Sequence, residues 1–192
     1  HEALYVAGTL TADTTWDTDV KIYTWDSSSA FKVVVDAGAT LTINPGVTVY
    51  GWTDANGRKS RLDVEGTLVA QATGEADRIV FTSANESPAA GDWSYLYFHP
   101  GSAAQLRYVT AEYATYGFYV AGGAPTLDQV MVRHMTQDGI ILAGSAAPVI
   151  TDAQISDVAG WGVKASSTTG NYQLLNSRIQ ATNGAVFQYY QG

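Results

Sequence analysis

One short pattern returns five times between residues 96 and 187, and it limits what this chain can fold into. Each copy is a tripeptide with apolar first and third residues: Leu96-Tyr97-Phe98, Phe118-Tyr119-Val120, Ile140-Ile141-Leu142, Val163-Lys164-Ala165 and Ala185-Val186-Phe187. The spacings are 22, 22, 23 and 22 residues, and a glycine directly precedes the last four copies. Such a period predicts a solenoid, because one repeat cannot bury its own apolar face and must stack on its neighbours.

Three earlier tripeptides extend the repeat toward the N-terminus. They are Leu4-Tyr5-Val6, Val33-Val34-Val35 and Leu62-Asp63-Val64, followed by steps of 29, 29 and 34 residues. Each longer step holds two more strand-like segments and a corner loop, at residues 23–31, 50–61 and 82–95. We therefore expect one all-β domain over residues 1–192, irregular over 1–95 and regular over 96–192. Three short strands per coil and little or no helix give about seven coils, stacked at about 4.8 Å into a rod roughly 34 Å long.

Composition agrees with strands and restricts the partners. Nineteen glycines, twelve tyrosines and only 15% charged residues suit strands joined by tight turns better than helices. The net charge of −8 argues against nucleic acid or an anionic membrane as partner, since both select clustered Lys and Arg. The chain has no cysteine and no apolar run of 18 residues, so we expect no disulfide, no thiolate metal site and no membrane span.

Four segments carry a more specific likeness. They are 37–49 (AGATLTINPGVTV), 62–70 (LDVEGTLVA), 79–83 (IVFTS) and 91–93 (GDW). These segments resemble the N-terminal coils of right-handed parallel β-helix proteins of the pectate-lyase-like superfamily, and in particular the secreted or surface repeat modules of bacteria and archaea. The resemblance covers residues 31–192 and implies a right-handed parallel β-helix. It implies no single function, since that superfamily includes lyases, hydrolases, tailspikes and adhesins.

One interpretation of the corner loops is a binding site, because insertions at one corner of a solenoid collect on one face. Aromatic rings there can stack on sugar faces while charged groups bind the hydroxyls. The side chains expected to line this carbohydrate groove are Trp25, Trp52, Asp54, Arg58, Tyr113 and Tyr116. The alternative is that tryptophans at this corner fold back and seal the core, which is the interpretation favoured for Trp93.

No set of residues predicts catalysis. Glycoside hydrolysis needs two facing carboxylates, and elimination of the pectate type needs carboxylate-bound calcium with a basic residue. The strands carry only isolated acids, such as Asp63, Asp128 and Asp152. Residues 54–57 (DANG) lack the later acid of a calcium loop and are interpreted as a turn. We therefore expect no catalytic residue, no metal and no cofactor.

The middle residues of the eight tripeptides should point outward and form one column. This column contains Tyr5, Val34, Asp63, Tyr97, Tyr119, Ile141, Lys164 and Val186. Six of these eight are apolar or aromatic on a face expected to be wet. Either β-propensity alone explains them, or the column is a lateral packing surface for a neighbouring rod, a loop or a sugar chain.

The ends of the repeat predict self-association. An open parallel stack exposes unpaired backbone groups, and uncapped ends allow one copy to stack head to tail on the next. The residues expected at this interface are Leu4, Tyr5, Val6, Ala185, Val186, Phe187, Tyr189 and Tyr190. The sequence thus favours a secreted, extracellular or cell-surface filament or scaffold without enzymatic activity. The alternatives are a carbohydrate-binding module, a polysaccharide lyase or hydrolase, and a piece of a larger surface protein whose coils continue.

Overall fold

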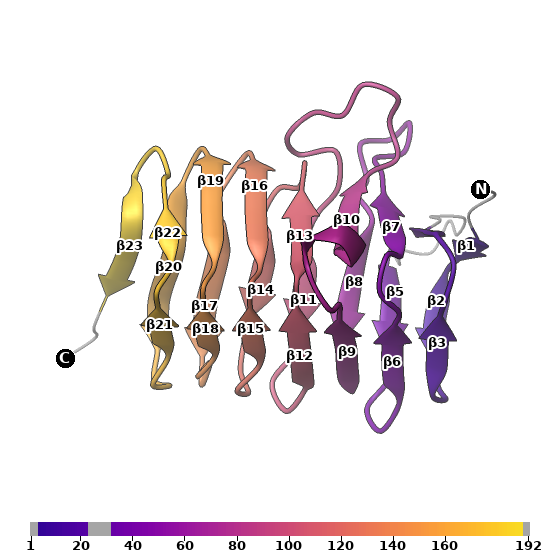
Figure 1. Ribbon diagram of the computed structural model, residues 1–192, viewed down its shortest axis with the longest axis horizontal. Coiled ribbons are helices and arrows are strands. Elements are labelled where there is room, and N and C mark those ends of the chain that lie inside the picture. The colour runs from indigo at the N-terminus through magenta and orange to yellow at the C-terminus, as the bar shows by residue number, and fades with distance from the viewer. Residues whose placement is uncertain (1–3, 23–31, 190–192) are drawn as a thin grey trace.

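Three parallel sheets wrap around one core in the computed structural model, which describes residues 4–22 and 32–189 (Figure 1). Sheet A contains β1 (Leu4–Val6), β4 (Val20–Ile22), β7 (Thr48–Gly51), β10 (Ile79–Ser83), β13 (Val109–Glu112), β16 (Met131–Met135), β19 (Gln154–Val158) and β22 (Arg178–Ile179). Sheet B contains β2 (Gly8–Leu10), β5 (Lys32–Val35), β8 (Arg61–Val64), β11 (Leu96–Phe98), β14 (Phe118–Val120), β17 (Ile140–Gly144), β20 (Trp161–Thr168) and β23 (Gly184–Tyr189). Sheet C contains β3 (Thr14–Trp16), β6 (Thr40–Ile43), β9 (Thr67–Gln71), β12 (Ala103–Arg107), β15 (Thr126–Asp128), β18 (Val149–Thr151) and β21 (Gln173–Leu175).

Each coil passes through sheet B, then sheet C, then sheet A, so strands three apart in the chain lie side by side. From β2 to β22 this order gives seven coils of three strands, arranged in a row with the two termini at opposite ends (Figure 1). The described residues contain one short helical turn, η1 (Glu75–Asp77), between sheets C and A. The predicted all-β, right-handed parallel β-helix with three strands per coil and about seven coils is confirmed. None of the described residues belongs to a helix long and apolar enough to cross a membrane.

The core is built from the inward residues of successive rungs. In sheet B, Leu62 lies beside Leu96, and Leu96 lies beside Phe118, with all three side chains fully buried. Each fully buried side chain of this kind contributes roughly 1.5–3 kcal/mol. The apolar first and third positions of each tripeptide therefore stabilise the stack.

The glycine that recurs before the later tripeptides has a steric cause. A Cβ atom on Gly117 would lie 2.6 Å from the carbonyl oxygen of Gly139, and one on Gly139 would lie 2.6 Å from that of Gly162. Neighbouring coils thus approach too closely here for any side chain. The regular coils also bend sharply from sheet C to sheet A at residues with positive φ, which are Tyr108, Gln129, Asp152 and Asn176.

The prediction that Leu4, Tyr5 and Val6 open the repeat is wrong. These residues form β1 of sheet A, where Tyr5 lies opposite Lys21. The first rung of sheet B is β2, whose Gly8 lies opposite Val33. The apolar alternation of residues 4–6 is a better match to the repeat than the sequence of β2, which begins with glycine, and that is why the pattern indicated the wrong strand.

The predicted register of the last rung is wrong by one residue. Val163 lies opposite Val186 rather than Ala185, and Lys164 lies opposite Phe187. The outward column therefore begins with Thr9 and ends with Phe187, instead of Tyr5 and Val186. Part of this column is also not exposed to solvent, because the outward side chains of Val34, Asp63 and Ile141 are buried.

Long insertions lie at the corner between sheets A and B. The described corner loops, residues 52–60 and 84–95, connect β7 to β8 and β10 to β11, and they rise above one edge of the stack (Figure 1). They are slightly shorter than predicted because β7 and β10 end at Gly51 and Ser83. The third predicted loop, residues 23–31, lies outside the described residues.

Candidate binding face on sheet B

The outer side of sheet B, here called the sheet B face, collects charged and aromatic side chains from consecutive coils. Alternation buries Leu62 and Val64 and turns Asp63 outward, and it does the same for Tyr97 between Leu96 and Phe98. Because the coils are in register, Asp63 lies opposite Val34 of β5 and Tyr97 of β11. Residues far apart in the chain therefore meet on this face.

A buried carboxylate organises the N-terminal part of the face. Asp63 is 0% exposed, although it points away from the core. Its Oδ2 accepts a hydrogen bond from Lys32 Nζ at 2.8 Å, and its Oδ1 lies 2.7 Å from Arg61 Nε. His99 Nε2 lies 3.4 Å from Oδ2. The Arg61 Nε contact at Oδ1 is an ion pair rather than an aligned hydrogen bond, whereas Arg61 Nη2 donates to Oδ2 at 3.1 Å.

Four tyrosines, the tyrosine patch, continue this cluster along the stack. They are Tyr95, Tyr97, Tyr116 and Tyr119, and their ring centroids lie between 5.0 and 6.0 Å apart in four contacting pairs. All four side chains are half-buried. Arg61 joins the two groups, because its Nη1 donates to the Tyr95 hydroxyl at 3.2 Å while its guanidinium carbon lies 5.7 Å from the Tyr95 ring centroid. The result is a continuous surface of ring faces beside cations.

The environment raises the pKa of two of these hydroxyls. Burial, followed by the nearby Tyr119, Tyr95 and Asp63, raises the pKa of Tyr97 above its ordinary value. Burial and Asp138 raise the pKa of Tyr116 in the same way. A tyrosine with an ordinary pKa is already protonated at neutral pH, and these shifts only widen the pH range in which both hydroxyls can donate a hydrogen bond to a ligand.

A second ion pair lies beyond the tyrosine patch, toward the C-terminus. Asp138 is buried, and its Oδ1 accepts a hydrogen bond from the Trp161 backbone N–H at 2.8 Å. Its Oδ2 lies 3.3 Å from Lys164 Nζ. Lys164 projects from β20 at the same outward position as Tyr97 and Tyr119, because residues 97, 119, 141 and 164 are in register. A cation thus stands on each side of the aromatic surface.

The residues predicted for the corner groove do not form one surface. Tyr116 joins the tyrosine patch, whereas Tyr113 stacks on His134 of sheet A with ring centroids 4.7 Å apart. Trp52 lines a hollow on the outer side of sheet A. Trp25 lies outside the described residues.

Asp54 and Arg58 close their own loop. Arg58 Nη2 lies 2.7 Å from Asp54 Oδ2, and Asp54 Oδ1 accepts hydrogen bonds from the backbone N–H groups of Asn56 and Arg58. Although desolvation opposes it, this hydrogen bonding to Arg58 and Asn56 holds the pKa of Asp54 below its ordinary value. The carboxylate is engaged in a turn, in agreement with the interpretation of residues 54–57.

Trp93 seals the core, as the sequence favoured. Its side chain is 2% exposed, and its indole N–H donates to the carbonyl oxygen of Glu112 at 2.8 Å. This tryptophan closes the corner under residues 84–95 and takes no part in the sheet B face.

The predicted assembly residues lie at opposite ends of the stack but on different sheets. Leu4, Tyr5 and Val6 belong to β1 of sheet A, and Ala185, Val186 and Phe187 belong to β23 of sheet B. Leu4 is 53% exposed and Val186 is 38% exposed, while Phe187 packs on Trp161 with ring centroids 5.2 Å apart. Tyr189 ends β23, its side chain is not among the described ones, and Tyr190 lies outside the described residues.

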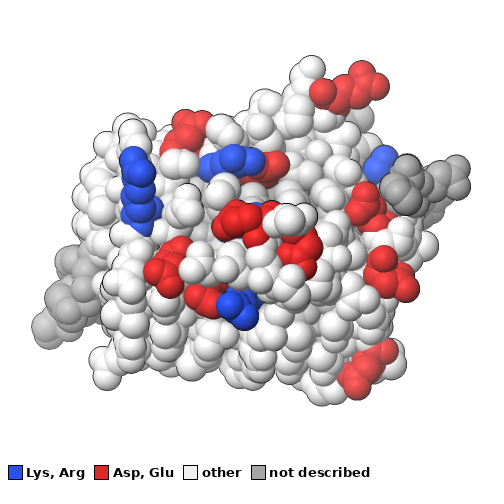
Figure 2. Space-filling model, viewed as in Figure 1, with Lys and Arg blue, Asp and Glu red and all other residues white. Residues whose placement is uncertain are grey.

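Charge on the rest of the surface is mixed. On the side of the molecule shown in Figure 2, acidic and basic side chains lie next to one another over the middle of the stack. Ion pairs away from the sheet B face include Arg133 with Glu112 and Arg78 with Glu75. Across residues 4–22 and 32–189, no group of three or more His, Asp or Glu side chains is placed to hold a metal ion.

Comparison with protein families identifies the fold family. The model of the pectate-lyase-like β-helix domain matches residues 8–130, more than half of the chain. The chain belongs to this family. Searches of the curated proteins and of the solved structures gave no significant match. As a pectate-lyase-like β-helix protein, the chain has an established architecture, and its function must be argued from its own surface.

Reasoning from sequence missed the tyrosine patch as a site, although its signal was present. Tyr97, Tyr119 and Asp63 stand in the predicted outward column of this β-helix domain. The sequence pointed to the corner loops instead, because insertions at one corner of a solenoid often bind partners. The column alone also omits Lys32, which lies two residues before Val34 on β5, and Tyr95, which lies at the end of the corner loop directly before β11.

Proposed function

We propose that the sheet B face binds an acidic polysaccharide. The observation that carries this proposal is the tyrosine patch held between two sets of ion-paired cations. Half-buried rings offer flat apolar surfaces to the faces of sugar rings, and the neutral hydroxyls of Tyr97 and Tyr116 can donate to sugar oxygens. The in-register stacking of the coils supports an extended ligand, because aromatic and cationic side chains follow one another along the stack and do not surround a single point.

Charge favours an anionic ligand. Lys32, Arg61 and Lys164 bring three positive charges to the face, against two from the buried Asp63 and Asp138. The cations reach solvent, with side chains 29%, 32% and 38% exposed, whereas both carboxylates are buried. A ligand that approaches this face therefore contacts cations before carboxylates, although the net charge of the whole chain is −8. From Lys32 on β5 to Lys164 on β20 the face takes in six rungs. The five steps between them, at about 4.8 Å each, give roughly 24 Å, which is long enough for several sugar residues.

The test compares one polymer in two charge states. Binding of a polyuronate is measured by calorimetry, beside the same polymer with its carboxylates reduced to alcohols. Tyr97→Ala and Tyr119→Ala should each weaken polyuronate binding at least about tenfold, equivalent to about 1.4 kcal/mol. Added salt should weaken binding of the polyuronate more than binding of the reduced polymer.

The matched control is Tyr113→Asn, which removes an aromatic ring from the sheet A side of the same corner. Tyr113 has φ 60°, a conformation that asparagine tolerates well, so backbone strain does not confuse the comparison. Polyuronate affinity should stay unchanged in this variant. Equal losses in Tyr113→Asn and Tyr97→Ala would assign the ligand to the corner groove instead, and equal affinity for both polymers would remove the role of charge.

End-to-end assembly and secretion stay predictions from the sequence. Leu4 and Val186 are exposed apolar residues at opposite ends of the described stack, which is compatible with association of copies. Electron microscopy of the purified chain at neutral pH tests this directly. Short separate rods at high protein concentration would argue against a filament.

A further inference from the structure

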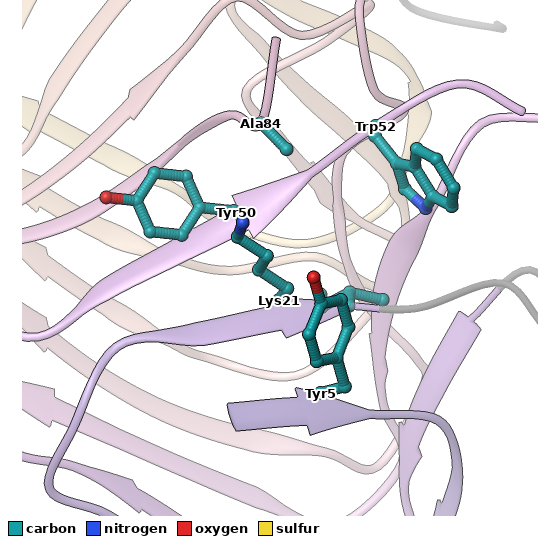
Figure 3. A pocket seen from close by; sticks show the side chains of 6 residues that line it. Tyr5, Lys21, Tyr50, Trp52 and Ala84 are labelled. Atoms are coloured by element: carbon teal, nitrogen blue, oxygen red, sulfur yellow. The ribbon is translucent and has the colours of Figure 1, made fainter. Parts of the chain in front are cut away.

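A separate hollow lies on the outer side of sheet A, across the corner from the sheet B face. Its volume is about 350 Å³, within the range of ligand pockets. The residues that line it are Tyr5, Lys21, Ile22, Tyr50, Trp52 and Ala84. Figure 3 shows Tyr5, Lys21 and Tyr50 on neighbouring strands, with Trp52 and Ala84 at the other edge of the hollow.

The register of sheet A builds the polar end of this hollow. Tyr5 of β1 lies opposite Lys21 of β4, and Lys21 lies opposite Tyr50 of β7. The Lys21 ammonium is 5.7 Å from the Tyr5 ring centroid and 5.8 Å from that of Tyr50. Three consecutive coils thus place one cation between two aromatic rings.

This cation has no carboxylate partner within the described part of the chain. Asp19, two residues earlier on the same segment, uses its Oδ1 to accept the Thr48 backbone N–H at 2.9 Å. Among the described residues, the contacts of the Lys21 ammonium are with the ring faces of Tyr5 and Tyr50. An anionic group bound here would gain a charge-assisted hydrogen bond.

The rest of the lining is apolar. Ile22 is buried at its base, and Trp52 and Ala84 line its other edge. Besides Lys21, the described residues bring two tyrosine hydroxyls to this hollow, which is few for the many hydroxyls of a sugar, and the indole nitrogen of Trp52 is itself buried. The lining therefore fits a flat apolar body that carries a single anionic group.

We propose that this hollow binds a small aromatic carboxylate, with the carboxylate on Lys21 and the ring against Tyr5, Trp52 and Ala84. The site is on sheet A and does not depend on polysaccharide binding by the sheet B face. It also gives a role to Trp52 other than the predicted sugar groove.

The experiment titrates the full chain with phenylacetate and with phenylacetamide, which has the same ring and no charge. Tryptophan fluorescence and ligand-observed NMR report binding. Phenylacetate should bind saturably, and phenylacetamide should bind roughly ten- to a hundredfold more weakly, because it cannot accept a charge-assisted hydrogen bond as an anion. Glucuronate, an acidic sugar, should bind more weakly than phenylacetate.

Lys21→Gln should lower phenylacetate affinity at least about tenfold and leave phenylacetamide unchanged. The matched control is Arg107→Gln, which removes a cation that lies 5.3 Å from the Tyr108 ring centroid on another part of the surface. Phenylacetate affinity should not change in this control. Equal affinity for phenylacetate and phenylacetamide, tighter binding of glucuronate, or no saturation with phenylacetate would each overturn the proposal.

Discussion

Asp63→Asn should destabilise the stack, because it removes a buried negative charge that three side chains share. Asparagine keeps the size of the side chain and one acceptor oxygen, but it leaves Lys32 and Arg61 without their counter-charge at 2.8 and 2.7 Å. Breaking a fully buried ion pair costs about 3–5 kcal/mol, and breaking an exposed one costs about 0–1 kcal/mol. Here the carboxylate is 0% exposed while its partners are 29% and 32% exposed, so part of the cost is recovered by hydration.

We therefore expect a loss of about 2 kcal/mol in the free energy of unfolding, and a fall of about 4–8 °C in the thermal midpoint for a chain of this size. Urea unfolding followed by tryptophan fluorescence measures the first, and calorimetry measures the second. Asp128→Asn is the control, because its ion pair with Arg107 has side chains 40% and 52% exposed. That control should lose less than about 1 kcal/mol.

A double-mutant cycle separates the ion pair from other effects. Lys32→Met should cost less in the Asp63→Asn background than in the wild-type chain, with a coupling energy of about 0.5–3 kcal/mol. Additive losses would show that Lys32 and Asp63 do not stabilise each other. Unchanged stability in Asp63→Asn would refute the reasoning that the carboxylate holds the cations of the sheet B face.

Three further predictions concern the fold. Gly66→Ala should cost about 3 kcal/mol or more in denaturant unfolding, since its Cβ would lie 2.2 and 2.3 Å from two backbone oxygens, whereas Gly74→Ala meets nothing within 4 Å and should be neutral. Leu142→Ala removes a fully buried side chain and should cost about 2–5 kcal/mol by the same measurement, against much less for Leu175→Ala, which is 46% exposed. A hydrogen bond from a nearby threonine hydroxyl lowers the pKa of Asp77, so the stability that this carboxylate adds is present above pH of about 4 and lost as pH falls through the lowered value. Asp77→Asn should therefore lower the thermal midpoint at pH 7, and the difference from the wild-type chain should close under acid.

The fold could be predicted because the interior obeys one rule along the whole chain. Leu62 and Val64 repeat in the next coil as Leu96 and Phe98, and such periodicity depends only on which residues are apolar. The apolar repeat fails to identify the strand in the first coil of the stack. Gly8 opens the first rung of sheet B without an apolar side chain, so the pattern indicated a strand that belongs to sheet A.

The candidate site was less predictable because its contacts depend on register across coils. Lys32, Arg61 and His99 come from three different coils and meet at one carboxylate. Sequence spacing shows that Asp63 points outward, but not that it is buried by its partners. Likewise, Tyr113 and Tyr116 are three residues apart but lie on either side of the corner between sheets A and B. Tyr113 stacks on His134 of sheet A, whereas Tyr116 contacts Tyr95 in the tyrosine patch.

The outward positions of the stack also bear on the proposed binding role of the sheet B face. Core packing constrains only the inward residues, and β-propensity is enough to account for outward Val34 and Ile141. It does not account for Asp63, since aspartate is depleted in strands and costly to bury without partners. A structural role would be served as well by another valine, because replacing a buried ion pair with apolar residues is often neutral or stabilising. What a valine could not do is hold Lys32 and Arg61 in place beside the tyrosine patch, and placing those cations is what an anionic ligand requires.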